Sequence, residues 1–416
     1  MEASICGRLV DARGHLGEGC ANVKDGYIAS ITREPRSDVV YRFFDEGLVV
    51  APGFIDLHVH LRGLELSYKE DEGSGTKAAL TSGITLVVDM PNTRPRLATP
   101  DAVKMKLEAL SRLSYVDYGV YAGVPDDMGH VRELAAMPIA GFKVYPEDMS
   151  LRVGVLTDVL GSGRLVVLHP ELPEAERVMD GDNPWRGLAR GCWMEGAAVH
   201  LLSTFGRPTR LHVTHVSCPG TLYASRELGA TTDVTPHHVL FDSEARGCYF
   251  RVNPPLRDSV TRSLLLKALI EGAVDAIASD HAPHAGVEKG FWPHCPSGIP
   301  WLGLWPLVMF SLVSSGAMSL AKFLELASLG PARVLGLESR YGLLEPGYRA
   351  DLVALDYTWR GRFVSTYSKA PYSHAFMREV YAIPKAVFVG GALAAEEGQV
   401  LLKPPALNPF GGVRLG

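Results

Sequence analysis

Residues 54–60 read FIDLHVH, an apolar β-type run that ends in His58 and His60. Seven similar runs follow it, and helical stretches lie between several of them. Eight strands that alternate with helices predict an α/β fold of the (β/α)8 barrel type, like that of TIM barrels. The seven later runs are ITLVVDM (84–90), VDYGVYAG (116–123), GFKVYP (141–146), RLVVLHP (164–170), RLHVTHV (210–216), TTDVTPHH (231–238) and AVDAIASDH (273–281).

Two of the intervening stretches have clear helical signals. In the first, over 100–113, Thr99 can act as the N-cap, and Pro100 occupies the first helical position. The second covers 257–272, where LLLKALI supplies an apolar face. Both predictions agree with a barrel in which helices cover the strands.

The two ends of the chain read instead as short strands and turns. Asp25-Gly26 is a hairpin turn signal, and DLVALD (351–356) and AVFVGGAL (386–393) each predict a strand. We therefore predict that residues 1–51 and 342–416 combine into one small β-sandwich domain. Residues 52–341 then form the barrel.

Composition excludes several classes of protein. The 416 residues are 47% apolar and 21% charged, with a net charge of −5, which is typical of a globular protein and unlike a nucleic-acid binder. The first residues lack the basic and long apolar regions of a signal peptide, and the apolar stretch 304–313 is too short to cross a bilayer. We expect a cytoplasmic protein that binds neither membranes nor nucleic acids.

The six cysteines are scattered and none has CxxC spacing. In a chain of this length they predict buried or incidental thiols in a reducing compartment. Disulfides stay open as an alternative, because some thermophiles keep them inside the cell.

Polar groups that can do chemistry follow most of the eight runs. The strands of a barrel end at one mouth, so these side chains are expected to meet in space. His58 and His60 are two residues apart on a strand and share a face, which lets both imidazoles bind one metal. A single histidine of this kind is more often a core or surface residue, and the prediction depends on the joint pattern of His58, His60, Lys143, His169, His215 and Asp280.

Lys143 has two interpretations. As an ammonium it has no lone pair for a metal, so it could simply be a substrate-binding cation or a surface lysine. Alternatively, its amine reacts with CO₂ to form a carbamate whose two oxygens bridge two metals. Asp280 follows the buried stretch AIAS and is either a cap or turn residue, or a metal ligand that also transfers protons.

At these residues the chain resembles the amidohydrolase superfamily and, within it, the dihydroorotases, over essentially its whole length. The motifs are GFIDLHVHLR (53–62), MPNTRP (90–95), GFKVYP, LHPE, HVTHVS, TPHH, VNPPLR and SDHAPH (279–284). The last is the most discriminating, because hydantoinases and allantoinases usually carry another residue in place of its final histidine. One departure is Gly298–Gly303 (GIPWLG), which lacks a glutamate that the family often has there.

The resemblance implies a cyclic amide hydrolase with two zinc ions. One metal is held by His58, His60, Lys143 and Asp280, and the other by Lys143, His169 and His215, with Lys143 N6-carboxylated as the bridging ligand. Other divalent metals could replace zinc. Arg62, Asn92 and His284 are implied to hold the substrate carboxylate, and Asn253 and Gly298 to contact the ring.

The implied reaction is the reversible cyclisation of N-carbamoyl-L-aspartate to L-dihydroorotate, with a metal-bridging hydroxide and with Asp280 as general acid and base. Two alternatives stay open. One is a hydantoinase, an allantoinase or another cyclic amidohydrolase. The other is a non-catalytic barrel that serves as a scaffold for a transcarbamoylase, against which the filled ligand positions count. A homodimer or an association with a transcarbamoylase is also left open.

Overall fold

The computed structural model describes residues 2–177, 183–290, 294–363, 365, 367–370 and 379–411. Its larger part is a parallel sheet of eight strands that neighbour one another in chain order, from β6 to β13. All eight predicted runs contain one of these strands. They are β6 (Phe54–Val59), β7 (Ile84–Asp89), β8 (Asp117–Gly123), β9 (Gly141–Val144), β10 (Leu165–Leu168), β11 (Arg210–Val213), β12 (Thr231–Val234) and β13 (Ala276–Ile277).

The segment that follows β13 closes this sheet into a barrel. Val59, at the end of β6, forms a parallel bridge with His281, and the amide of His60 donates to the carbonyl of His281 at 2.8 Å. The Asp56 carboxylate adds a side-chain link between the same segments, because it accepts from the amide of Ser279 at 3.1 Å. Closure therefore brings the SDHAPH motif directly beside the HVH motif.

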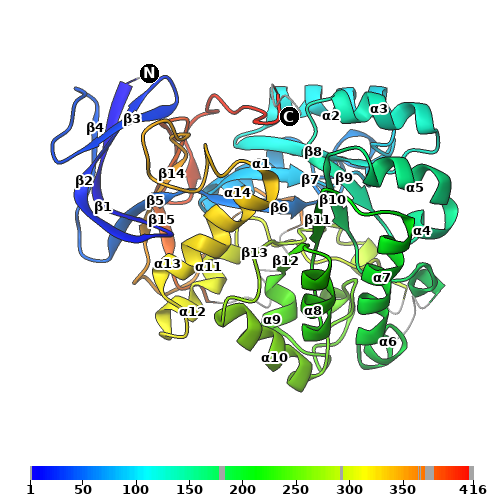
Figure 1. Cartoon of the computed structure of the whole chain (residues 1–416). Helices are drawn as coiled ribbons and strands as arrows, with labels where there is room; N and C mark the ends of the chain where they lie inside the picture. Colours follow the sequence, from blue (N-terminus) through cyan, green and yellow to red (C-terminus); the bar gives the residue numbers. More distant parts are fainter. Residues whose placement is uncertain are drawn as a thin grey trace.

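Helices surround the barrel, as Figure 1 shows. The predicted helix over 100–113 is confirmed as α2 (Pro100–Leu113), with the Thr99 hydroxyl accepting from the amide of Ala102, and the predicted second helix is α10 (Ser259–Ile270). The others are α1 (Glu72–Thr81), α3 (Met128–Ala136), α4 (Asp148–Leu151), α5 (Val153–Leu160), α6 (Asn183–Ala189), α7 (Cys192–Phe205), α8 (Pro219–Glu227), α9 (Pro236–Leu240), α11 (Trp305–Met309), α12 (Ser311–Ser314), α13 (Leu320–Leu324) and α14 (Gly330–Leu335). None of the helices in the described ranges has both the length and the apolar character of a membrane span.

The two ends of the chain share a second, mixed sheet. It runs in the order β17-β16-β15-β14-β5-β1-β2-β3, with β4 paired to β1, and lies at one side of the barrel (Figure 1). Its strands wrap around a common core that includes Ile5, Val23, Leu352 and Phe388. The strands are β1 (Glu2–Asp11), β2 (Gly14–Lys24), β3 (Tyr27–Thr32), β4 (Val40–Phe43), β5 (Leu48–Pro52), β14 (Leu352–Asp356), β15 (Ile383–Val389), β16 (Ala392–Glu396) and β17 (Gln399–Val400).

Turn chemistry explains two hairpins of this sheet. The predicted turn at Asp25-Gly26 joins β2 to β3, and both residues have positive φ, 52° and 88°. The run AVFVGGAL, which we predicted as one strand, is instead the hairpin of β15 and β16. Gly390 and Gly391 have φ of 55° and 75°, a conformation in which glycine carries no Cβ penalty, so the chain reverses there.

The prediction of free thiols is wrong, because the six cysteines form three disulfides. Cys6 and Cys20 are partners across β1 and β2. The other two pairs join residues 26 and 47 positions apart in the sequence, Cys192 with Cys218 and Cys248 with Cys295. Spacing could not reveal these pairs, because only the fold brings the partners together.

Candidate active site

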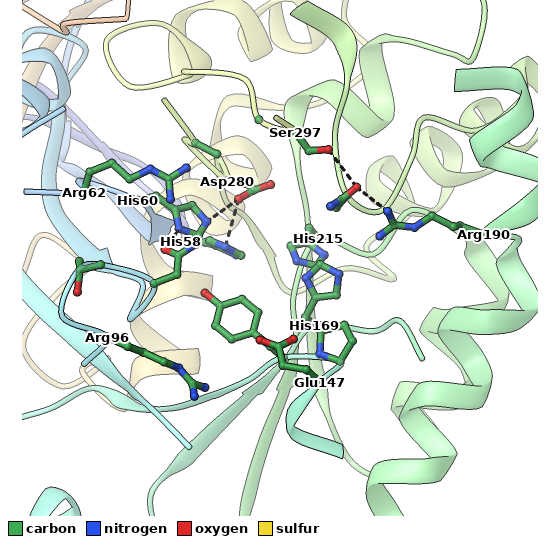
Figure 2. A pocket seen from close by; sticks show the side chains of 17 residues that line it. His58, His60, Arg62, Arg96, Glu147, His169, Arg190, His215, Asp280 and Ser297 are labelled. Carbon is green, nitrogen blue, oxygen red and sulfur yellow. Dashed lines mark hydrogen bonds and ion pairs between the residues drawn. The ribbon is translucent and has the colours of Figure 1, made fainter. Parts of the chain in front are cut away.

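A cavity of about 520 Å³ opens at the mouth where the barrel strands end. Seven predicted site residues, which lie at or after the ends of five strands, line it: His58, His60, Arg62, Asn92, His169, His215 and Asp280. Asn253 and Gly298 also line it. The structure therefore brings nine of the eleven predicted site residues to the wall of one cavity. Figure 2 shows this pocket, with the imidazoles and Asp280 gathered near its centre.

His58, His60 and Asp280 converge on one point. The Asp280 Oδ1 atom lies 3.3 Å from Nε2 of His58 and 3.1 Å from Nε2 of His60. The Nδ1 atom of each ring forms a hydrogen bond on the side away from Asp280. Nδ1 of His58 bonds to the Thr214 hydroxyl and Nδ1 of His60 to the Asn92 carbonyl oxygen, both at 2.6 Å. Such support fixes each ring so that Nε2 is available to a metal.

A second pair of imidazoles lies next to the first group. The ring centroids of His169 and His215 are 4.4 Å apart, and His215 is 5.2 Å from His58. Nε2 of His169 is engaged by the Glu171 carboxylate at 2.8 Å, which leaves Nδ1 for a metal. The amide of His215 donates to Asp233 at 2.6 Å, and Asp233 also accepts from Thr214, so one buried carboxylate supports both groups.

Lys143 lies within β9 and is fully buried. Its Nζ has no hydrogen-bond partner among the described residues, and it is not among those that line the cavity. Burial lowers the pKa of the amine to about 7, although the charges of Asp280, Asp233 and Glu147 act in the opposite direction. Its charge in turn adds to burial, the largest cause, in lowering the pKa of His58, His169 and His215.

The chemistry of these residues fits a metal site, and three of them, His58, His60 and Asp280, offer ligand atoms close enough together to hold one ion. Burial, as the largest cause, lowers the pKa of His58, His169 and His215, so the rings are neutral at neutral pH, as metal ligands must be. The Nζ of Lys143 and Nδ1 of His215 are buried polar atoms that find no partner in the described part of the chain. A buried polar atom without a partner is costly, and a bound ion would remove that cost.

Three site residues have a backbone that side chains rarely adopt. Arg62, His215 and Asp280 have φ of 57°, 41° and 46°. Left-handed geometry at a residue other than glycine costs about 1 kcal/mol or more and persists where the surroundings impose it, often at active sites. The strain therefore falls on residues that lie two or three positions after the ends of β6, β11 and β13.

Arg62 and His284 contact each other. Arg62 Nη2 lies 3.4 Å from Nε2 of His284, and Nε donates to the carbonyl of Pro283 at 3.3 Å. His284 is not among the described residues that line the cavity. Burial and the charges of Arg62, Lys289 and Lys69 lower its pKa to about 2, so the ring is neutral. Its Nε2 can donate to the Ser297 carbonyl while Nδ1 accepts from Lys69.

Gly298 lies in the lining at a position where only glycine fits. Its φ is 142°, and a Cβ there would lie 2.3 Å from the carbonyl oxygen of Ala282. The chain can therefore pass close to the segment that carries Asp280 only because this side chain is absent.

Several residues that the sequence reasoning did not single out complete the site. Glu171 belongs to the LHPE motif, so its position two residues after His169 could have suggested a role. Thr214 and Asp233 lie within predicted strands. The alternation of apolar and polar residues there does not indicate that their side chains contact proposed metal ligands. Arg96 and Arg190 also line the cavity, Arg96 held by Asp148 at 3.0 Å and Arg190 by Glu171. No motif in the sequence marks Arg190.

Comparisons with known proteins agree with this geometry. Residues 49–155 and 212–394 match the model of the amidohydrolase family. The chain is 44% identical to a dihydroorotase of Aeropyrum pernix, covering 83% of this chain and 84% of that one. For a dihydroorotase of Sulfolobus acidocaldarius the identity is 38%, covering 86% of each chain. Among solved structures, an L-hydantoinase (dihydropyrimidinase) from Arthrobacter aurescens superposes with a TM-score of 0.86 at 24% identity, covering 97% of this chain and 98% of that one, which confirms the barrel fold.

Proposed function

The chain belongs to the amidohydrolase family and, within it, to the dihydroorotases, and from this premise we propose that it interconverts N-carbamoyl-L-aspartate and L-dihydroorotate in pyrimidine biosynthesis. The observation that carries the proposal is the meeting of His58, His60 and Asp280 at one point of the barrel mouth. The paired rings of His169 and His215 lie beside them. This is the donor set that a binuclear cyclic amide hydrolase needs.

We propose that two zinc ions occupy the site, with Lys143 carboxylated. His58, His60, Lys143 and Asp280 would hold one ion, and Lys143, His169 and His215 the other. The lowered pKa of Lys143 supports the carbamate, because a neutral amine is available near neutral pH to attack CO₂. When bound, the two cations supply Lewis acidity, which makes an amide carbonyl more electrophilic and water more acidic.

Asp280 is the group that moves the proton in this proposal. In ring opening, its carboxylate accepts a proton from the attacking water and delivers it to the leaving ring nitrogen. In ring closure it takes a proton from the carbamoyl nitrogen. Its carboxylate contacts the two Nε2 atoms and lines the cavity, where a substrate nitrogen can reach it.

Arg62 is the proposed anchor of the α-carboxylate, because its planar fork matches a carboxylate bidentately. The carbonyl oxygen of Asn92 accepts from Nδ1 of His60. Its NH₂ group is therefore the part that can donate to the α-carboxylate of the substrate. Both ring nitrogens of His284 have partners within the protein, the Lys69 ammonium and the Ser297 carbonyl, and we propose that the ring holds Arg62 in place by packing against its guanidinium rather than by a hydrogen bond. Asn253 and Gly298 would contact the ring.

The function is tested by incubating the zinc-loaded protein with L-dihydroorotate, hydantoin and allantoin in parallel and measuring which ring opens. We expect opening of dihydroorotate, loss of activity on chelation and recovery when zinc is added. Faster opening of hydantoin or allantoin would assign the site to a sister activity. A pure chain that neither contains nor takes up metal, measured by elemental analysis, would favour the scaffold alternative.

Substitution of Arg62 by lysine tests the carboxylate anchor. We expect Arg62→Lys to raise KM about tenfold or more and to change kcat less, because a point charge loses the bidentate fit. Lysine tolerates the left-handed backbone as arginine does, so the fold should persist. The matched control is Arg349→Lys, which removes a buried fork on Asp117 outside the cavity. An Arg62→Lys variant whose KM equals that of the control contradicts the assignment.

The proposal also includes the organisation of the protein in the cell. We propose that the small β domain comprises residues 1–51 and 342–416 and the barrel 52–341. We propose a homodimer or an association with a transcarbamoylase, and a cytoplasmic location. Three disulfides are consistent with that location in an organism that keeps intracellular disulfides.

A further inference from the structure

Three donors converge on a single oxygen of the pocket wall, Oδ1 of Asn253. Nη1 of Arg190 donates to it at 2.9 Å and the hydroxyl of Ser297 at 3.2 Å, and Nη2 of Arg186 forms a third contact. Figure 2 shows Arg190 and Ser297 on the side of the pocket away from Arg62 and Arg96. Arg186 and Arg190 are both buried, so neither cation can turn to bulk water instead.

This convergence fixes which way the amide of Asn253 points. A carbonyl oxygen can accept several hydrogen bonds, whereas the NH₂ group can only donate. Rotating the amide by half a turn would set its N–H groups against two buried guanidinium donors, and no acceptor would replace the lost oxygen. The Nδ2 atom is therefore the part of Asn253 available to the cavity that it lines.

Arg190 has a second partner that leads to the predicted metal ligands. Its Nε donates to Oε1 of Glu171 at 2.8 Å, and its Nη2 contacts Oε2 of the same carboxylate. Glu171 in turn holds Nε2 of His169 at 2.8 Å. One buried carboxylate therefore joins the Arg190 guanidinium to the His169 imidazole.

We propose that Arg190 is a positioning residue that orients two parts of the site at once: the Asn253 amide, which presents its N–H groups to an uncharged carbonyl oxygen of the substrate, and, through Glu171, the imidazole of His169. The inference rests on the proposed function, from which the substrate oxygen follows. Both the ring and the open-chain compound contain a urea-type carbonyl between two nitrogens, and an N–H donor in the wall matches it.

Lysine cannot replace Arg190 in this arrangement. The guanidinium donates in three directions from one plane, whereas an ammonium on a flexible stem cannot serve Glu171 and Asn253 with the same geometry. With saturating zinc, we expect Arg190→Lys to raise KM for L-dihydroorotate about tenfold and to lower kcat by a smaller factor. We also expect its zinc affinity, measured by competition with a chromophoric chelator, to fall about tenfold or more.

The control for Arg190→Lys is again Arg349→Lys, which loses the same kind of buried fork at a residue that is not among those lining the cavity. If Arg190→Lys differs from this control in neither KM nor zinc affinity, or in only one of them, the shared role is wrong. If the wild-type protein does not open dihydroorotate, the proposed function fails instead. Zinc affinity then still decides whether Arg190 acts on His169.

Asn253→Asp tests the orientation of the amide in case Arg190→Lys does not fold. The aspartate keeps an oxygen for Arg186 and Arg190, so its melting temperature should equal or exceed that of wild type. Its second oxygen replaces the N–H donor and repels a carbonyl oxygen, so KM should rise more than in Asn253→Ala. An Asn253→Asp variant that binds dihydroorotate as well as wild type, or better than Asn253→Ala, overturns the inferred orientation.

Discussion

Asp280→Asn is expected to fold normally and to lose turnover by about a thousandfold or more, because general acid–base catalysis alone contributes 10²–10⁴ and Asp280 is also a proposed metal ligand. The fold should persist because asparagine is among the residues that best tolerate the left-handed backbone found at this position, where φ is 46°. The measurements are kcat for dihydroorotate, the melting temperature and the zinc content.

Zinc content separates the two proposed roles of Asp280. A variant that keeps its zinc but loses kcat lacks only the proton transfer, whereas one that loses zinc as well lacks a ligand. Asp117→Asn is the matched control, because Asp117 is a buried aspartate paired with Arg349 that does not line the cavity. Turnover of Asp280→Asn within tenfold of wild type would remove Asp280 from the mechanism.

The barrel and the clustering of the proposed metal ligands could be predicted from the sequence, because each depends on signals local to one strand. His58, His60, His169, His215 and Asp280 all stand at or just after strand ends, and parallel strands of a barrel end at one mouth. Once eight strands are recognised, the meeting of these side chains follows from topology without knowledge of any long-range contact.

The remaining features depend on contacts between residues that are far apart in the sequence. Their spacing does not indicate that the fold brings them together. Arg190 is 63 residues from Asn253 in the sequence, and only packing brings its guanidinium to that amide. The same holds for Cys248 and Cys295. The contact of Asn92 with His60 could not be predicted from the sequence either. An asparagine in a turn motif can form a hydrogen bond with a substrate or with a neighbouring imidazole equally well.

Lys143→Met should have opposite effects on stability and on activity. Without metal, the wild-type protein buries an amine that has no partner among the described residues, and methionine replaces it with an apolar side chain of similar length. Removing an unpaired buried polar group stabilises a protein by roughly 1–3 kcal/mol. We therefore expect a higher melting temperature for the metal-free variant, together with loss of the second metal and of nearly all turnover.

The pH dependence of this difference follows from the pKa of Lys143. Burial lowers it from 10.5 to about 7 in the folded protein. The unfolded chain therefore binds more protons between these two values, so the stability of the metal-free wild type rises with pH across that window. Below pH 7 the full penalty is present, and the advantage of Lys143→Met should be greatest there and shrink toward pH 10.

Added zinc should reverse the order of the two proteins. The stability that wild type gains grows with the logarithm of its metal affinity, whereas Lys143→Met has lost a ligand proposed to be shared by both ions and gains less. The measurements are melting temperatures with and without zinc at several pH values, zinc content and kcat. A metal-free variant that is less stable than wild type would show that the buried amine of Lys143 does not destabilise the fold. A variant that keeps two zinc ions and its activity would show that Lys143 is not a metal ligand.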